Sequence, residues 1–149
     1  MENSLNFKEL PDFTRFQVPL LIWMAFIFAL SSIPGSALSP YEFMDAHLIA
    51  HSLLFGVLYY LGYRAFKHQH YSRFVSEFSL LITLLFVMAY GASDEYHQSF
   101  TPGRSEELKD FLWDLSAAVV VLFIVLIVEK FRERRKMSRT SVEAKDLRE

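Results

Sequence analysis

The sequence contains no cysteine, which excludes disulfide bonds and any site that needs a thiolate as nucleophile or metal ligand. It shows no internal repeat, and its 149 residues are enough for one domain. Hydrophobic residues make up 52% of the chain and charged residues 21%, but long stretches carry almost no charge. This segregation favours apolar membrane spans separated by charged loops. No cofactor is expected, and nucleic-acid binding is not expected either, because the basic residues concentrate in one tail beside an apolar run.

Four runs are apolar enough to predict transmembrane helices. They are Val18–Ile33, Leu48–Phe66, Phe78–Ala92 and Phe111–Val128. A helix needs about 20 residues to cross a bilayer, and about 17 are tolerated, a length that these runs reach if their polar ends are interfacial. A soluble helix bundle would need a polar stripe with a period of 3.6 residues, and the middles of the first, third and fourth runs have none. The fold class predicted is therefore all-α, a polytopic membrane protein with four transmembrane helices.

The distribution of lysine and arginine predicts the orientation of these helices. The loop between the first two runs has neither residue, whereas the loop after the second run carries Arg64, Lys67 and Arg73. The densest basic segment follows the fourth run. Because loops rich in lysine and arginine stay in the cytoplasm, both termini are expected there. The predicted organisation is a cytoplasmic segment 1–17, a membrane domain 18–128 and a basic cytoplasmic tail 129–149, frayed from residue 140 onward.

The polar segment between the third and fourth runs is the candidate functional site. It reads DEYHQSFTPGRSEELKDFLWD from Asp94 to Asp114. Ionisable groups at a membrane boundary are costly if unpaired, so they mark functional sites by default. The Pro-Gly-Arg sequence at 102–104 predicts a turn, with Ser105 as the cap of the next helix. Arg104 lies on this turn, and its planar guanidinium can bind a carboxylate or a phosphate through two hydrogen bonds.

With both termini in the cytoplasm, the segment between the third and fourth runs is expected to face outside the cell. Helical spacing predicts which side chains meet at this outer end of the helices. His51 lies about one turn inside the second run and shares a face with Phe55. Residues that share a helical face also recur in the third and fourth runs: Tyr90, Asp94 and His97 in the one, Asp110 and Asp114 in the other. Histidine and carboxylate groups from three helices are therefore expected at one depth. Small residues at 116–118 would permit close helix approach there.

The same residues resemble a known family. The pattern formed by Asp94, Glu95, Gln98, Phe100, the Pro-Gly-Arg turn and Asp110 resembles the VanZ-like family of small bacterial membrane proteins, which is named for an accessory protein of glycopeptide (teicoplanin) resistance. His51 with Phe55 and Gly56, and the Ser31–Gly35 segment, are similar to further parts of the family pattern. The resemblance implies a multi-pass protein of the bacterial inner membrane and cell envelope. Three features depart from the pattern. Asp114 stands where asparagine is common, and Ala117 where glycine is common. The Asp-Lys pair that often precedes the family's histidine is absent, and His47 stands close to the place of its acid.

Four interpretations of the site stay open at the sequence level. In the first, a lipid-linked or peptidoglycan-related anionic ligand binds at the outer leaflet, and the effect extends to glycopeptide sensitivity. The ligand-binding residues would be Arg104, Gln98, Asp110 and Asp114. In the second, the chain is a hydrolase or transferase acting on a phosphate-containing lipid. Its candidate catalytic residues are His51, Asp94, Glu95 and His97.

The third interpretation is an internal network in which Arg104 pairs with Asp94, Glu95 or Asp110 and so fixes the packing of the last two helices. The fourth is a metal site built from histidine and carboxylate side chains. It has little support, because the sequence has no compact ligand spacing such as HExxH, and no metal is expected. Membrane lipids are the partners expected in every case.

Overall fold

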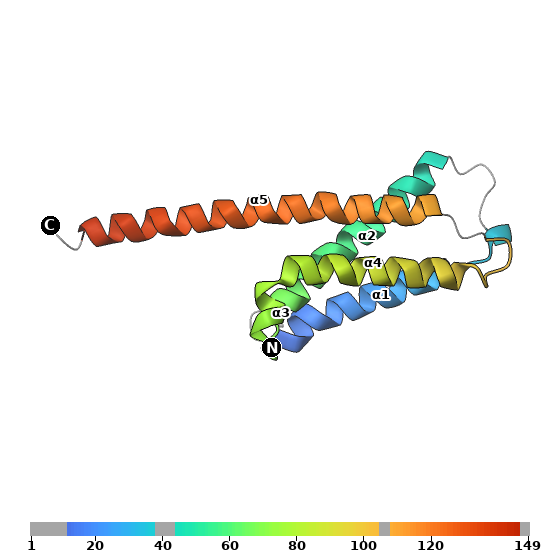
Figure 1. Ribbon diagram of the computed structural model, residues 1–149, viewed down its shortest axis with the longest axis horizontal. Coiled ribbons are helices and arrows are strands. Elements are labelled where there is room, and N and C mark those ends of the chain that lie inside the picture. The colour runs from blue at the N-terminus through green and yellow to red at the C-terminus, as the bar shows by residue number, and fades with distance from the viewer. Residues whose placement is uncertain (1–11, 38–43, 105–107, 147–149) are drawn as a thin grey trace, which may run out of the picture.

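The computed structural model describes residues 12–37, 44–104 and 108–146, and every element in these ranges is helical. The four long helices and the short elements between them follow in chain order (Figure 1). They are the π-helix η1 (Phe13–Gln17), α1 (Val18–Ser31), the 3₁₀ helix η2 (Gly35–Ala37), α2 (Met44–Lys67), α3 (Arg73–Glu77), α4 (Ser79–Gln98) and α5 (Leu108–Asp146). The predicted all-α fold is confirmed.

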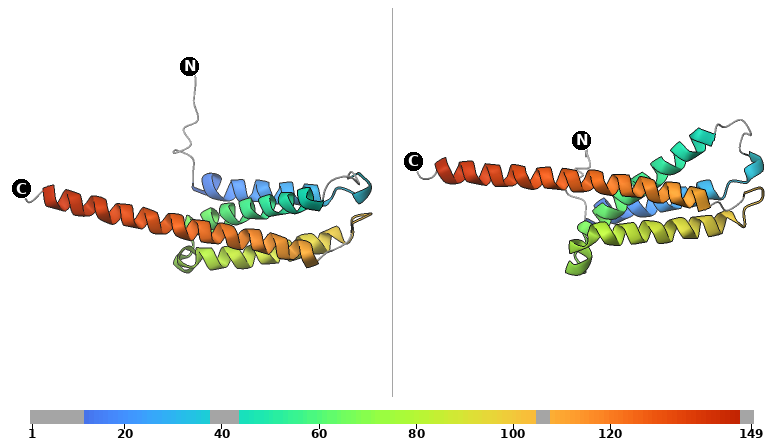
Figure 2. Two further views of the ribbon diagram at one scale, coloured as in Figure 1. Left: turned by 90° about the horizontal axis from the view of Figure 1, so that it is seen from above. Right: turned by 45° about the horizontal axis from the view of Figure 1, so that its top comes forward.

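The long helices run alternately in opposite directions, so that alternate connections lie at the same end of the bundle (Figure 1). The end of α1, η2 and the turn after α4 gather at one end, and η1 and α3 gather at the other (Figure 2). Helix α2 is central, because it packs against α1, α4 and α5. This alternation brings the Pro-Gly-Arg turn close to the end of α1, although the two are about 70 residues apart in the chain.

Local sequence explains where several helices begin and end. Pro19 lies in the first turn of α1, directly after the π-helix η1, and Pro34 follows the end of α1. Ser72 caps α3, with its hydroxyl accepting a hydrogen bond from the backbone N–H of Val75 at 3.4 Å. The buried apolar core lies among the long helices. It consists of Leu20, Ile27, Phe55, Leu58, Tyr59, Tyr63, Ala65, Val87, Ala118 and Val125.

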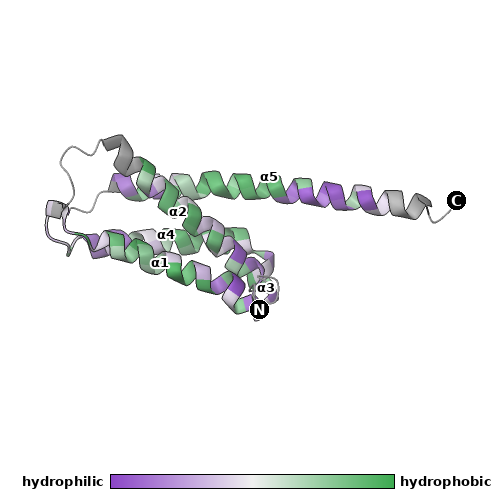
Figure 3. Cartoon of the chain, turned by 180° about the vertical axis from the view of Figure 1, so that it is seen from behind, coloured by the Kyte–Doolittle hydropathy of each residue, from purple (hydrophilic) through white to green (hydrophobic). Residues whose placement is uncertain are grey.

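Two stretches of the described residues are long and apolar enough to cross a membrane, Phe13–Ser31 and Lys109–Ser141. Only 17% of each apolar stretch is buried, whereas the core helix of a soluble protein would be mostly buried. Apolar residues cover the middle of the bundle. Polar residues cover the C-terminal part of α5 and the region of α3 (Figure 3). These features are those of a membrane protein. Four spans and cytoplasmic termini remain predictions.

The structure corrects the sequence analysis at the end of the chain. Helix α5 does not end near Val128 but continues to Asp146, through residues 140–146, which were expected to fray. Its 39 residues correspond to about 58 Å at about 1.5 Å per residue. The part beyond Val128 extends away from the other helices (Figure 1). The basic segment is thus a continuous extension of the last apolar helix.

Two further predictions about α5 have different outcomes. Residues 105–107, with the expected cap Ser105, lie outside the described part of the chain. Of the three small residues expected to allow close helix approach, Ala118 is fully buried in the core. Ser116 instead is exposed, and its hydroxyl donates to the carbonyl of Leu112 in its own helix at 2.7 Å. The close approach therefore involves Ala118 and not Ser116.

Candidate functional site

The Pro-Gly-Arg turn docks directly on the end of α1. The backbone N–H of Gly35 donates to the carbonyl of Pro102 at 3.0 Å, and Gly103 adopts a positive φ of 75°. A Cβ atom on Gly35 would lie 2.0 Å from the carbonyl oxygen of Gly103, which is closer than any side chain tolerates. The two backbones can therefore meet only because residue 35 has no side chain, and residue 103 also has a conformation that favours glycine.

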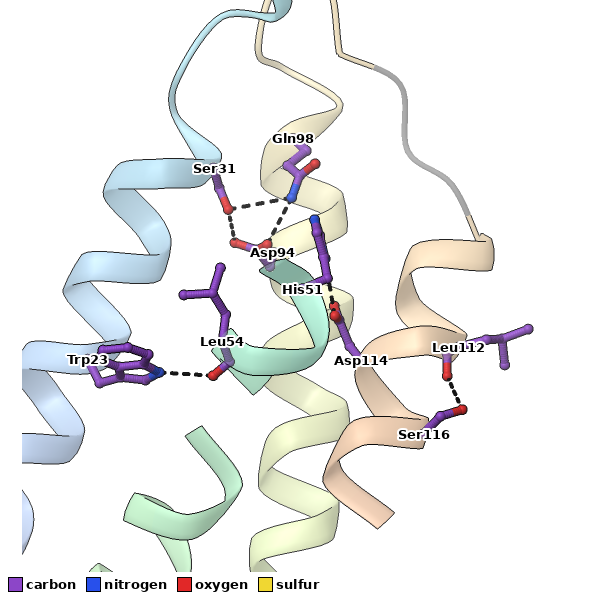
Figure 4. Close-up of polar contacts among 9 residues, drawn as sticks. All are labelled: Trp23, Ser31, His51, Leu54, Asp94, Gln98, Leu112, Asp114 and Ser116. Carbon is purple, nitrogen blue, oxygen red and sulfur yellow. Dashed lines mark hydrogen bonds and ion pairs between the residues drawn. The ribbon is translucent and has the colours of Figure 1, made fainter. Parts of the chain in front are cut away.

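Asp94 is the centre of a buried hydrogen-bond group between α1 and α4 (Figure 4). The hydroxyl of Ser31 donates to its Oδ1 at 2.6 Å, and the amide of Gln98 donates to its Oδ2 at 2.9 Å. The same amide also lies 3.5 Å from the Ser31 hydroxyl. Both carboxylate oxygens of Asp94 thus have a donor, so the group is internally satisfied.

A second buried contact joins α2 and α5. The Nδ1 atom of His51 lies 3.1 Å from Oδ1 of Asp114 (Figure 4). The other carboxylate oxygen of Asp114 is buried and has no hydrogen-bond partner in the described part of the chain. Asp94 and Asp110 are near enough to Asp114 to interact with it electrostatically. The α1–α4 group and the α2–α5 pair are therefore close enough for their carboxylates to interact electrostatically.

Together these side chains form what we call the polar layer, a set of buried polar residues drawn from all four long helices. Each member is at most 9% exposed. Its members are Ser31, His51, Asp94, Glu95, Gln98, Asp110 and Asp114. The layer contains four carboxylates and one histidine. The expectation that three helices bring histidine and carboxylate groups to one depth is confirmed, and α1 contributes as a fourth helix.

His97 lies apart from His51. Its Nε2 atom is 3.0 Å from the hydroxyl of Ser32, and its ring stacks on Phe28 with centroids 4.3 Å apart. Tyr90 also turns toward α1, where its hydroxyl donates to the carbonyl of Met24 at 2.7 Å. The shared face predicted for Tyr90, Asp94 and His97 is therefore confirmed. In the described part of the chain, no three histidine, aspartate or glutamate side chains are arranged to hold a metal ion.

Arg104 ends the turn that follows α4, at the same end of the helices as the polar layer. Its side chain is half-buried, and its Nε atom is buried with no hydrogen-bond partner. Among the described residues the ion pairs are those of His51, His70, Arg73 and Arg132, and none involves Arg104. The hydrogen bonds that Asp94 accepts come from Ser31 and Gln98, and a clamp from Arg104 to a carboxylate stays one of the open interpretations. The turn is held by its backbone, including a bond from the N–H of Arg104 to the carbonyl of Thr101 at 3.1 Å.

Sequence reasoning missed the contribution of α1 to the site. Ser31 belongs to the polar layer, Ser32 contacts His97, and the hydroxyl of Thr101 lies 3.4 Å from the carbonyl of Ser31. A signal was present, because Ser31 and Ser32 end an otherwise apolar run. Hydroxyl groups at the end of an apolar helix often donate to their own backbone. Only Ser32 does so, to the carbonyl of Phe28 at 2.7 Å.

The fold and the site together define an all-helical membrane protein with a buried polar layer at one end of its helices. Residues 16–129 match the VanZ/LLP1 family, which covers all four long helices up to the basic extension of α5. The chain belongs to this family. No curated protein and no solved structure matches it.

Proposed function

We propose that this chain is a multi-pass protein of the bacterial inner membrane that binds an anionic ligand of the cell envelope. The polar layer and Arg104 face the outside of the cell, and the ligand is lipid-linked or related to cell-wall synthesis. Arg104 binds its anionic group, most simply a phosphate. Gln98, Asp110 and Asp114 shape the surroundings of that group.

Exposed apolar side chains support the proposal that α2 and α4 also span the membrane. On α2 such residues follow each other at helical spacing, Ile49, Leu53, Val57 and Tyr60, and each is at least 37% exposed. On α4, Leu81 and Leu85 are more than half exposed. These stripes are favourable against lipid and unfavourable against water. Labelling of single cysteines introduced in the cysteine-free chain tests the topology, with residue 36 expected to react from outside and residue 70 from inside.

The state of Arg104 is the observation that carries the ligand proposal. A guanidinium has five N–H donors and stays charged at all physiological pH values. At Arg104 a buried Nε–H has no acceptor among the described residues, although the polar layer at the same end of the helices holds four carboxylates. An unpaired buried donor is destabilising, and a hydrogen bond to a charged partner is among the strongest available. A phosphate or carboxylate from outside would supply that partner.

Binding can be measured on the full chain in nanodiscs by native mass spectrometry. The probe is a polyprenyl phosphate, compared with the uncharged polyprenol of the same chain length. We expect the wild type to retain the phosphate and Arg104→Ala to lose it. Lys109→Ala is the matched control, because Lys109 is an exposed cation at the same end of the bundle. Equal retention by wild type and Arg104→Ala, or equal retention of phosphate and alcohol, would contradict the proposal.

A consequence for antibiotic sensitivity follows if the bound ligand is a cell-wall precursor. Expression of the wild type would then change the teicoplanin concentration that inhibits growth, and expression of Arg104→Ala at the same level would not. An identical shift with both proteins would separate any resistance effect from ligand binding at Arg104.

The second candidate function is a membrane-embedded hydrolase or transferase acting on a phosphate-containing lipid. The His51–Asp114 contact favours it, because a carboxylate that orients an imidazole is a recurring feature of general-base and nucleophilic catalysis. Phosphate release from the polyprenyl phosphate would be followed over time. Catalysis predicts that His51→Gln still binds the lipid and releases no phosphate, whereas a binding protein releases none even as wild type.

A further inference from the structure

A large cleft lies at the end of the bundle opposite the polar layer. Its walls come from η1, α2 and the part of α5 that leaves the bundle, and its volume is about 1030 Å³. In Figure 1 the start of the described chain and the end of α2 lie at the same end of the bundle, and α5 runs past that end. None of the residues assigned to the polar layer lines this cleft. It is therefore a separate feature of the protein.

The two helix walls of the cleft change from apolar to basic along their length. On α5, one face carries the apolar residues Val121, Val125 and Val128 and then, after them, Arg132 and Lys136. The steps of three or four residues place all five on the same side of the helix. On α2 the same spacing carries Tyr60 and Tyr63 and then Arg64 and Lys67. Each helix thus contributes apolar side chains, which we call the apolar floor of the cleft. Next to them it contributes basic side chains, which we call the cationic rim.

Aromatic contacts hold part of this rim in place. The guanidinium carbons of Arg15 and Arg64 each lie 5.2 Å from the centre of the Phe16 ring, and His68 stacks on the same ring at 4.3 Å. Partial burial, together with the charges of Arg64 and Arg15, lowers the pKa of His68 below its usual value. Two guanidinium groups are thus positioned around one ring by cation–π contacts.

The cationic rim is not neutralised within the described part of the chain. Five arginine and lysine residues line the cleft against three carboxylates, Asp12, Glu129 and Glu133. Two of these carboxylates already pair with residues of the cleft lining, Asp12 with His70 at 2.6 Å and Glu129 with Arg132 at 3.2 Å. Arg15 and Arg64, next to each other on Phe16, have no ion pair among the described residues. An anion bound in the cleft would offset the repulsion between the two guanidinium groups.

We propose that the cleft binds an anionic phospholipid, with its phosphate between Arg15 and Arg64 and an acyl chain along the apolar face of α5. Basic pockets beside membrane helices are suited to anionic headgroups. The apolar floor distinguishes a lipid from free phosphate, because it offers an acyl chain a surface that inorganic phosphate cannot use. The site does not depend on the function of the polar layer at the other end.

The test compares two double variants that remove the same number of charges. Arg15→Gln/Arg64→Gln changes the cleft, and Arg134→Gln/Arg135→Gln changes the same basic region outside it. The binding of phosphatidylglycerol to the purified full chain is measured by native mass spectrometry, with phosphatidylcholine as the neutral competitor. We expect the cleft variant to bind phosphatidylglycerol about thirtyfold more weakly, since each basic residue near an anionic surface contributes roughly a factor of five. The control is expected to lose less than threefold, and Arg104→Ala to behave as wild type.

Two outcomes would overturn the proposal. An equal loss in both double variants would show a diffuse charge effect in place of a site. Binding of inorganic phosphate to the protein at the concentration at which phosphatidylglycerol binds would show that the acyl chain plays no part. A photoreactive phosphatidylglycerol provides a measurement on the wild type that needs no variant to fold. Its adducts are expected on peptides that contain Arg64 or Arg132, and adducts confined to other helices would refute the site.

Discussion

The two ends of this helical bundle handle charge in opposite ways. At the polar layer, carboxylates and a histidine are buried, and Asp94 and His51 lie 2.6–3.1 Å from hydrogen-bond partners on their own or neighbouring helices. At the basic end, the charges are largely exposed around an open cleft, and the two arginines on Phe16 have no ion pair with a carboxylate among the described residues. Removing a buried, bonded charge leaves other buried groups unsatisfied, whereas removing an exposed charge changes mainly the attraction of ligands. Variants at the first end should affect stability, and variants at the second should affect binding.

The largest expected effect is that of Gly35→Ala. The added Cβ would overlap the carbonyl of Gly103, so the turn must move away from the end of α1. We expect a loss of about 3 kcal/mol in the free energy of unfolding, at the upper end of what overpacking costs. Thermal unfolding in detergent measures it. Ser36→Ala, at the exposed neighbouring position, is the control and should be nearly neutral. An unchanged melting temperature for Gly35→Ala would refute the backbone-to-backbone docking.

The next effect is that of Asp94→Ala in the polar layer. The variant leaves the buried hydroxyl of Ser31 and the amide of Gln98 without their acceptor. We expect it to destabilise the protein by about 2 kcal/mol in the same assay. Ser31→Ala removes one donor and leaves Asp94 bonded to Gln98, so its cost is expected to be about 1 kcal/mol. If Ser31→Ala cost more than Asp94→Ala, Asp94 would not be the centre of the group.

Arg64→Gln at the basic end should change stability far less. Its side chain has no ion pair among the described residues and contacts aromatic rings, so we expect a loss of less than about 0.5 kcal/mol. The same variant should weaken phosphatidylglycerol binding several-fold. A strong loss of stability without any change in lipid binding would make the basic end resemble the polar layer and would remove the contrast between them.

The smallest expected effect concerns pH. Because the folded chain lowers the pKa of His68, through burial and the nearby Arg64 and Arg15, the unfolded chain binds more protons in that pH range. His68 therefore contributes a small stabilisation above its usual pKa, and this is lost as the pH falls from that value through the lowered pKa of the folded chain. Phosphatidylglycerol should raise the pKa of His68, since an anion offsets the arginine charges. A titration of the imidazole resonances by NMR measures the shift, and a lower pKa with lipid would place the headgroup elsewhere.

The sequence predicted the long helices because charge-free runs of this length have few alternatives, and it predicted the depth of the polar residues because helical spacing is regular. Residue types and spacing placed His51, Asp94 and Asp114 in the site. What it missed depends on contacts between distant segments. The role of Ser31 needs α1 and α4 side by side, and the state of Arg104 depends on the docking of its turn on Gly35. The persistence of α5 to Asp146 was also missed, because a polar segment was interpreted as a frayed tail although it contains good helix formers such as Glu129, Lys130 and Arg132.

The central claim is that Arg104 is held beside the polar layer to bind a ligand and not to stabilise the helices. One paired measurement tests it most directly: the melting temperature and the polyprenyl phosphate binding of Arg104→Ala, each compared with Lys109→Ala. We predict melting temperatures within about 2 °C of each other, because Arg104 has no ion pair among the described residues, and loss of the lipid phosphate in Arg104→Ala alone. A large drop in melting temperature for Arg104→Ala with lipid binding retained would contradict it.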